Sequence, residues 1–258
     1  MAHEFDGQKY QEAATHQHEW GKRLVHELQL DGTESVLDLG CGDGSVTELI
    51  ADIVPSGEVL GIDASQGMLD AARLKERRNL RFARMDIDGM CLDHRFDVIF
   101  SNATLHWLKN HRKLMPSIMA ALKPGGMIRL NFAGAGNCTN FFRAVRQVMK
   151  APAFARHFEK FEWPWYMPTL DEYRPIVIEA GFLDVEVWTE NADRVFPTQE
   201  AIAGWIDQPC IVPFLSPLPN EAKKPFRDAT VYKTLELARH SSGGYSETFR
   251  RINVLARR

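Results

Sequence analysis

Hydrophobic and polar positions along the first half of the chain follow two alternating patterns. Short apolar runs typical of buried strands occur at Ser35–Leu39, Glu58–Ile62, Leu80–Ala83, Phe96–Phe100 and Met127–Phe132. Helical spacing of apolar residues occurs at Gln17–Leu28, Ser45–Ile53, Gln66–Lys75 and about His111–Leu122. Strands that alternate with helices predict right-handed crossovers, and therefore a parallel sheet with helices on both faces.

The alternation breaks after Phe132. Residues 134–170 form a segment rich in aromatic residues, and residues 191–220 are a second stretch without a regular pattern. A helix near Leu170–Ala180 and a strand at Val185–Thr189 lie between them. A helix near Glu221–Ala238 and a final strand-like run, Phe249–Ala256, follow. We therefore expect the sheet to end in a strand pair rather than in another crossover.

The first strand leads into a turn with three glycines, Gly40, Gly42 and Gly44. A turn without side chains before a helix lets a ligand rest on backbone N–H groups at the positive end of the helix dipole. The spacing is shorter than the G-x-G-x-x-G of dinucleotide sites. Asp38, inside the end of the strand, would repel a pyrophosphate but would attract an ammonium group.

Two further carboxylates follow the next two strands. Asp63 lies about twenty residues after the glycines, where a carboxylate can accept both ribose hydroxyls. Asp86 can accept from the exocyclic amine of adenine, and Asp88 in the same loop is the alternative residue for this contact. A ligand with an ammonium group, a ribose diol and adenine but no phosphate is S-adenosylmethionine. In the alternative interpretation Asp63 caps the next helix, and Asp38 caps backbone groups of the turn.

These motifs together resemble those of class I S-adenosylmethionine-dependent methyltransferases. The segments that carry the resemblance, over about residues 35–132, are VLDLGCGDG (36–44), GID (61–63), FDVI (96–99) and LKPGG (122–126). The resemblance implies an α/β, Rossmann-like, doubly wound sheet of seven mostly parallel strands with an antiparallel last strand. It also implies a helical and aromatic cap inserted after the fifth strand.

The same resemblance implies one methyltransferase domain over residues 1–258, with segments of about 134–170 and 191–240 as a cap over the acceptor site. It implies S-adenosylmethionine as the cofactor. The cofactor-binding residues carried over from it are Tyr10, Gln17, Trp20, Asp38, Gly40, Cys41, Gly42, Asp63, Ala64, Met68, Asp86, Ile87, Ser101, Asn102 and His106.

Two segments narrow the resemblance. SNATLHW (101–107) and WPWYMP (163–168) are similar to the branch that holds trans-aconitate, malonyl-carrier-protein and juvenile hormone acid methyltransferases. The likeness implies carboxyl O-methylation of a small or medium organic acid. A carboxylate is already ionised at pH 7, so the transfer needs alignment and exclusion of water but no general base.

Three alternatives stay open. The acceptor could be an amine, a hydroxyl or a carbon, with His106 as a base. The chain could also be a non-catalytic regulator that binds S-adenosylmethionine. A dehydrogenase is disfavoured by the glycine spacing and by Asp38.

The candidate acceptor contacts are His106, Trp165 and Tyr166. His106 could instead fix its loop by bonding to backbone. Phe158 and Phe161 are expected to form the hydrophobic seam by which the inserted cap packs on the sheet, rather than to contact the acceptor. Cationic partners for a carboxylate could be Arg129, whose face is not determined by alternation, or Arg143 and Arg146, which lie three residues apart on one inserted helix.

Composition and motifs limit which partners and which cellular location are expected. The net charge is −3 and no basic block occurs, so nucleic acid is not expected as a partner. No apolar run is long enough for a membrane span or a signal peptide, and no HExxH-type cluster indicates a metal. The four cysteines have no CxxC spacing, which favours reduced thiols and a cytoplasmic location.

Overall fold

The computed structural model describes residues 15–92 and 95–258, with the backbone alone for residues 15–19 and 208–209. The chain divides into two compact units. The first runs up to Ala135 and adds Trp165–Glu190 and Arg251–Arg258. The second consists of Gly136–Pro164 and Asn191–Arg250. These stretches overlap the two segments expected to form a cap, and their placement over an acceptor site stays a prediction.

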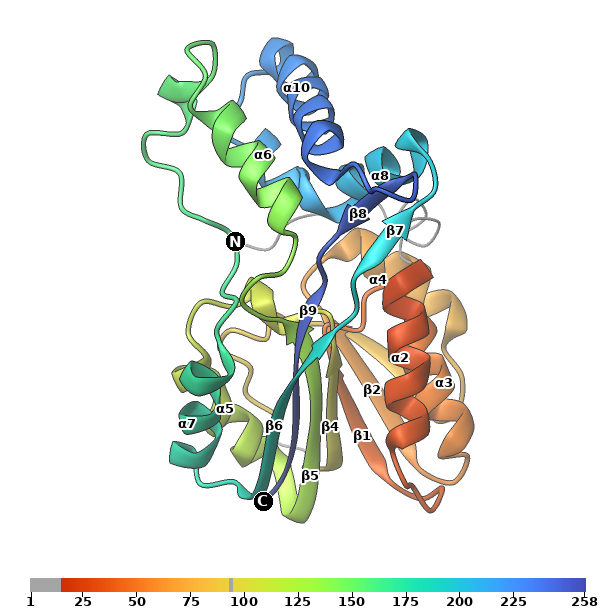
Figure 1. The fold of residues 1–258 in the computed structure, drawn as a ribbon. Helices are drawn as coiled ribbons and strands as arrows, with labels where there is room; N and C mark the ends of the chain where they lie inside the picture. Colours follow the sequence, from red (N-terminus) through yellow and green to blue (C-terminus); the bar gives the residue numbers. More distant parts are fainter. Residues whose placement is uncertain (1–14, 93–94) are drawn as a thin grey trace. The chain divides into compact units, whose positions relative to one another are not determined.

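The first unit is built on a seven-stranded sheet with the order β3-β2-β1-β4-β5-β9-β6 (Figure 1). Its strands are β1 (Ser35–Leu39), β2 (Glu58–Asp63), β3 (Leu80–Arg84), β4 (Phe96–Asn102), β5 (Leu122–Ala133), β6 (Leu183–Asn191) and β9 (Arg250–Arg257). The first five strands pair in parallel, and β9 runs antiparallel to β5. The expected Rossmann-like fold with an antiparallel last strand is therefore confirmed.

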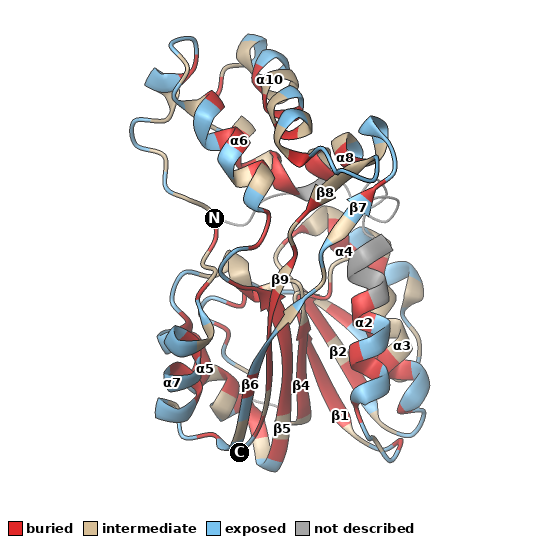
Figure 2. Ribbon diagram, in the orientation of Figure 1, coloured by how far each residue is buried: buried red, intermediate tan, exposed pale blue. Residues whose placement is uncertain are grey.

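Helices cover both faces of this sheet, as Figure 1 shows. They are α2 (Thr15–Glu27), α3 (Ser45–Ile53), α4 (Gln66–Ala72), α5 (His111–Ala121) and α7 (Leu170–Glu179), with short 3₁₀ turns at Arg73–Lys75 and Leu105–Trp107. One apolar cluster joins α2, α3 and α4 to the sheet, and another joins α5 and α7 to it. The strands β1, β4, β5 and β9 are buried along most of their length, whereas β6 is largely exposed (Figure 2). Side chains of β1 and β4 alternate between the two clusters, so Val36 and Leu37 belong to different ones.

The boundaries predicted from the apolar pattern are close to those observed. The strand predicted at Ser35–Leu39 and the helix predicted at Ser45–Ile53 match their elements residue for residue. The fifth strand begins earlier than predicted, at Leu122, because α5 ends at Ala121 and the pairing register shifts at Lys123–Gly126. A local irregularity in the ladder of this kind has no signature in the apolar pattern.

The second unit is mainly helical. It holds α6 (Thr139–Met149), a 3₁₀ turn (Ala155–His157), α8 (Gln199–Trp205), a π turn (Ile206–Cys210), α9 (Val212–Leu215), α10 (Asn220–Ala238) and the strand pair β7 (Arg194–Phe196) and β8 (Tyr245–Glu247). The prediction that 191–220 is irregular was wrong. Thr198 caps α8, and Pro213 occupies the first turn of α9, where a missing N–H costs nothing.

The interior of the second unit is lined with aromatic rings. Phe214 contacts Phe141, Phe161 and Trp163, with ring centroids 5.2 to 6.0 Å apart. Phe158 packs on Phe226 at 5.1 Å. Both phenylalanines thus pack on aromatic rings of their own unit, and their packing on the sheet stays a prediction. No helix in the described part of the chain is long and apolar enough to cross a membrane.

Candidate functional site

The three glycines of the first turn have positive φ angles, but they differ in what surrounds them. A Cβ on Gly40 would lie 2.1 Å from Cγ2 of Thr104, and one on Gly44 would lie 2.7 Å from the ring of Phe82. A Cβ on Gly42 would meet no described atom within 4 Å. Gly40 and Gly44 are therefore required by packing, whereas Gly42 borders open space that a ligand can use.

Asp38 lies in β1 just before this turn, and its side chain is 2 % exposed. Its Oδ2 accepts a hydrogen bond of 2.7 Å from the hydroxyl of Thr47 on α3. Burial raises the pKa of Asp38 to about 7, against the lowering effect of the Thr47 bond, and the nearby Asp63 carboxylate adds to the rise. A cation at this position would favour the ionised form.

Asp63, at the end of β2, ties the glycine turn to the neighbouring strand. Its Oδ2 accepts from the Gly42 N–H at 3.0 Å, and its Oδ1 accepts from the Ser65 N–H at 2.9 Å. Ser65, not Asp63, caps α4, because the Ser65 hydroxyl accepts from the Met68 N–H. The capping alternative for Asp63 is therefore wrong. A carboxylate has about four acceptor positions, so this one can serve both the turn and a ligand.

The residues after β2 and β3 form the next part of the edge. Asp86 is exposed and its Oδ1 accepts from the Asp88 N–H at 3.0 Å, while Ile87 is buried. Asp88 pairs with Lys113 at 3.3 Å on the surface. An exposed ion pair of this kind contributes little to stability, so the preference for Asp86 over Asp88 as the adenine contact stays a prediction. The other two predicted residues of this region lie at the start of α4, where the side chain of Met68 is buried and Ala64 is partly buried.

The end of β4 is bonded to the glycine turn. The buried Ser101 hydroxyl donates to the carbonyl of Leu39 at 2.8 Å, and the Thr104 hydroxyl donates to the carbonyl of Gly40 at 3.0 Å. Asn102 is the register partner of Asn131 on β5. The predicted residues of β1 and β4 therefore meet at one edge of the sheet. Cys41 is buried in the same turn, and its N–H donates to the Ile62 carbonyl. These contacts agree with a role for Cys41 in packing.

The three candidate acceptor contacts also lie together, although His106 is about sixty residues from Trp165 and Tyr166 in the sequence. The carbonyl of His106 accepts from the Tyr166 N–H at 2.8 Å, and the Trp165 ring lies 5.4 Å from that of Trp107. Nδ1 of His106 is buried and has no hydrogen-bond partner in the described part of the chain. Burial, followed by the positive charge of Arg251, lowers the pKa of His106 to about 3, so the imidazole is neutral at pH 7.

A second histidine, which sequence reasoning passed over, holds this turn in place. His111 is buried and its Nε2 donates to the carbonyl of Leu105 at 2.9 Å. Its Nδ1 must then accept from the hydroxyl of Tyr173 on α7, at 2.9 Å. Burial lowers the pKa of His111 to about 4, so the imidazole is neutral at pH 7, and its two hydrogen bonds fix the tautomer. No local signal distinguishes such a histidine from any other residue that begins a helix.

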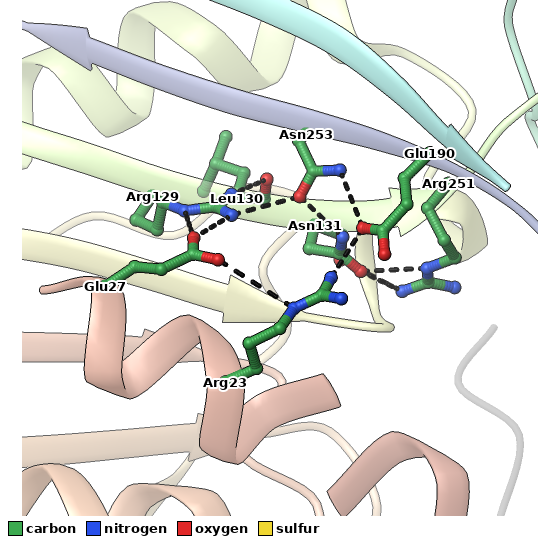
Figure 3. A network of polar contacts seen from close by, with 8 residues as sticks. All are labelled: Arg23, Glu27, Arg129, Leu130, Asn131, Glu190, Arg251 and Asn253. Atoms are coloured by element: carbon green, nitrogen blue, oxygen red, sulfur yellow. Dashed lines mark hydrogen bonds and ion pairs between the residues drawn. The ribbon is translucent and has the colours of Figure 1, made fainter. Parts of the chain in front are cut away.

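The candidate cationic residues differ in their burial and in their partners. Arg129 is buried on the α2 face of the sheet and forms an ion pair of 2.7 Å with Glu27 (Figure 3). Arg143 and Arg146 are exposed on α6, and Arg146 lies over the ring of Trp163 at 4.3 Å. Arg251 on β9 was not predicted. It is 4 % exposed and lies near the end of β4 and β5.

Three predicted residues belong to the N-terminal segment. Trp20 is buried on α2, and the guanidinium of Arg251 lies 4.7 Å from the centroid of its ring. Gln17 is on the same helix, but its side chain is outside the described residues, as is all of Tyr10. Among residues that the structure describes, no group of three His, Cys, Asp or Glu side chains is arranged to hold a metal.

Comparison with known proteins agrees with this geometry. A family model described as a methyltransferase domain matches residues 36–126. A trans-aconitate 2-methyltransferase of Methylobacterium radiotolerans is 30% identical over 220 residues, covering 80% of this chain and 79% of the relative. One from Acidovorax sp. is 25% identical and covers 99% of both chains.

Solved structures show the same fold. A methyltransferase from Bacillus halodurans covers 92% of this chain and 97% of its own, with a TM-score of 0.60 and 20% identity. Phosphoethanolamine N-methyltransferase 2 of Haemonchus contortus, in complex with S-adenosyl-L-methionine, covers 93% of this chain and 52% of its own, with a TM-score of 0.59 and 22% identity.

The fold and these comparisons define an enzyme of the S-adenosylmethionine-dependent methyltransferase class, with S-adenosylmethionine as its cofactor. Within that class, the chain belongs to the family that includes the trans-aconitate 2-methyltransferases.

Proposed function

We propose that this enzyme methylates a carboxylate of a small or medium organic acid. The names of the relatives indicate an acid as the acceptor. The observation that favours a carboxylate over a hydroxyl or an amine is the state of His106, whose pKa of about 3 makes it a poor base at pH 7. A carboxylate, with a reference pKa near 4, needs no base.

The cofactor fits the edge formed by β1, β2 and β4. Asp38 would pair with the ammonium group of its methionine part, and the open space at Gly42 would admit that part to the backbone. Asp63 would accept from the ribose, and Asp86 with Ile87 would meet the adenine. The other residues proposed around it are Tyr10, Gln17, Trp20, Gly40, Cys41, Ala64, Met68, Ser101, Asn102 and His106.

When bound, S-adenosylmethionine supplies a methyl group on a positively charged sulfur. It would supply this methyl group to an acceptor oxygen as its carbon–sulfur bond breaks, so the products would be a methyl ester and S-adenosylhomocysteine. In the proposal His106, Trp165 and Tyr166 orient the acid and exclude water, which would otherwise solvate and weaken the carboxylate as a nucleophile. No proton leaves the acceptor in this step.

The alternatives make different demands on the same residues. Methylation of an amine or a hydroxyl with His106 as base would need an imidazole that binds a proton near pH 7, which its buried position opposes. A non-catalytic regulator would bind the cofactor and turn over no acceptor.

We also place the reaction in the cytoplasm, since none of the four cysteines forms a disulfide.

The test is incubation with methyl-labelled S-adenosylmethionine and separate panels of organic acids, amines and phenols, with trans-aconitate among the acids. The expected product is a methyl ester, which releases labelled methanol in mild alkali. Label that is stable to alkali would overturn carboxyl methylation. Tight cofactor binding without any labelled product would favour the regulator.

A further inference from the structure

Two charged side chains of α2 reach across to the face of the sheet that this helix covers (Figure 3). Glu27, the last residue of α2, accepts from Nη2 of Arg129 on β5 at 2.7 Å and from its Nε at 3.2 Å. Arg23, one turn earlier, donates to Oε2 of Glu190 on β6 at 2.6 Å. On β9, which lies between these two strands, Asn253 accepts from Arg129 at 3.1 Å. The C-terminal half of α2 is therefore bonded to both β5 and β6.

The two ion pairs differ in how far they are buried. Arg23 and Glu190 are both partly exposed, so water weakens their attraction and their pair contributes little. The side chain of Arg129 is 3 % exposed, whereas that of Glu27 is 44 % exposed. Burial lowers the pKa of Arg129, and the bond to Glu27 is the largest effect that opposes this. Glu27 is thus the main counter-charge of a guanidinium that has lost nearly all of its water.

This asymmetry determines what the pair of Glu27 and Arg129 does for the helix. Removing only one partner of a buried ion pair leaves an uncompensated charge, which strongly destabilises the packed state. When α2 lies on the sheet, Glu27 supplies the compensating charge. Without that charge α2 would pack over an uncompensated guanidinium, and positions of the helix that let water reach Arg129 would gain in population.

The middle of α2 packs on the edge proposed to bind the cofactor. A Cβ on Gly21 would lie 2.4 Å from Cγ2 of Val46 on α3 and 3.1 Å from Nδ2 of Asn102 at the end of β4. The absence of a side chain at Gly21 therefore allows the helix to approach the glycine turn's own helix closely. Trp20, the preceding residue, is buried and is one of the residues proposed to contact the cofactor.

We propose that Glu27 is a positioning residue for the cofactor, because it neutralises Arg129 and so holds α2, with Trp20, against the cofactor-binding edge. Glu27 acts through the helix and does not itself contact S-adenosylmethionine. The inference rests on the proposed place of the cofactor and makes no use of the acceptor. When only a fraction of the molecules has α2 packed on the sheet, the apparent affinity for the cofactor falls by that fraction.

The test is calorimetric titration of the protein with S-adenosylhomocysteine, which requires no acceptor. Glu27→Gln keeps the size of the side chain but removes its charge, and we expect it to weaken binding about tenfold. Glu186→Gln removes an exposed carboxylate from β6 and is the matched control. The control should leave the affinity within about twofold of wild type. A folded Glu27→Gln variant with wild-type affinity overturns the assignment.

A second substitution distinguishes positioning from a general loss of contacts. Arg129→Met removes the buried charge, so the double variant Glu27→Gln/Arg129→Met should fold and should bind S-adenosylhomocysteine more tightly than Glu27→Gln alone. Arg129→Met by itself should weaken binding less than Glu27→Gln, because the half-exposed carboxylate of Glu27 stays solvated. Independent losses of two stabilising contacts would instead add, and a double variant that binds more weakly than either single variant overturns the proposal.

Hydrogen exchange of the backbone amides locates the effect in the molecule. Glu27→Gln should speed exchange in α2 about tenfold, while β1 and β4 keep their wild-type rates. Saturating S-adenosylhomocysteine should restore most of the protection of α2, since the ligand binds the packed form. Equal acceleration in α2, β1 and β4 would show a loss of global stability alone and would overturn the positioning role.

The outcomes separate this assignment from the proposals above. If Asp63→Ala weakens binding and Glu27→Gln does not, the cofactor site stands and Glu27 is wrongly assigned. If Gly21→Ala, whose methyl group displaces α2 from Val46, keeps wild-type affinity, α2 is not part of the cofactor site and the inference fails. If wild type does not bind S-adenosylhomocysteine, the placement of the cofactor fails with it. Label that is stable to alkali overturns carboxyl methylation alone and leaves the role of Glu27 unchanged.

Discussion

Among single residues, Asp38 makes the clearest prediction about pH. Its pKa is raised to about 7 in the protein without ligand, well above its value in an unfolded chain. The protonated form therefore favours folding, and this contribution is fully present below about pH 4 and is lost as pH rises through about 7. A bound ammonium group favours the opposite, ionised form, so cofactor binding must release a proton at acidic pH.

We expect the affinity for S-adenosylhomocysteine to rise roughly tenfold between pH 5.5 and 7, where the ligand's own amine stays charged. Asp38→Asn should bind more weakly and without this slope. Calorimetry over that pH range measures both. The same slope in the Asn variant would show that Asp38 does not pair with the ammonium group.

The glycines of the turn allow a matched pair of substitutions. Gly40→Ala places a methyl group 2.1 Å from Thr104 and should destabilise the fold by more than about 2 kcal/mol. Gly42→Ala meets no described atom, so only its positive φ costs stability, about 1 kcal/mol, while cofactor affinity falls. Urea unfolding and calorimetry on both variants distinguish the effects. Equal losses of stability would contradict the difference in packing between the two glycines, and unchanged cofactor affinity in Gly42→Ala would mean that Gly42 does not border the ligand.

At the scale of elements, a bond from α7 fixes the turn at Leu105–Trp107. The Tyr173 hydroxyl donates to Nδ1 of His111, whose other nitrogen holds the turn. Tyr173→Phe should cost about 1–3 kcal/mol of stability, because it leaves a buried acceptor unpaired, and should lower kcat/KM by loosening the turn that carries His106. Tyr232→Phe, on an exposed ring of α10, is the control and should leave unfolding in urea unchanged. A Tyr173→Phe protein as stable as wild type would contradict the role of His111.

Elements were well predicted where the pattern is local. Apolar runs and helical spacing located all five strands of the first half and the helices between them, because burial on one or both faces imposes the spacing on neighbouring residues. The helix α8, the π turn and α9 were missed, since Pro and polar residues that cap helices look like loop residues when no contact is known. The predicted carboxylates could be placed at the strand ends for the same local reason.

For the molecule as a whole, ligand binding must add to stability by mass action. At 100 times its Kd, S-adenosylhomocysteine should raise the free energy of unfolding by about 2.7 kcal/mol. Asp63→Ala should weaken cofactor binding by about 1–3 kcal/mol and shrink this gain at the same ligand concentration. Denaturant unfolding with and without the ligand measures both. The ligand-free variant gives the separate cost of losing the bonds to Gly42 and Ser65. An undiminished gain would remove Asp63 from the cofactor site.

The sequence by itself determined the order of strands and helices in the first half of the chain, the turn of three glycines, the carboxylates at the strand ends and the identity of the cofactor. Each of these depends on residues close together in the chain. The tertiary structure alone decided that Gly40 is required by Thr104, that Arg129 pairs with Glu27, and that His106 is neutral. It also brought Arg251 beside Asn131, 120 residues away. Antiparallel pairing of β9 with β5 and burial create these relations, and neither leaves a local pattern in the sequence.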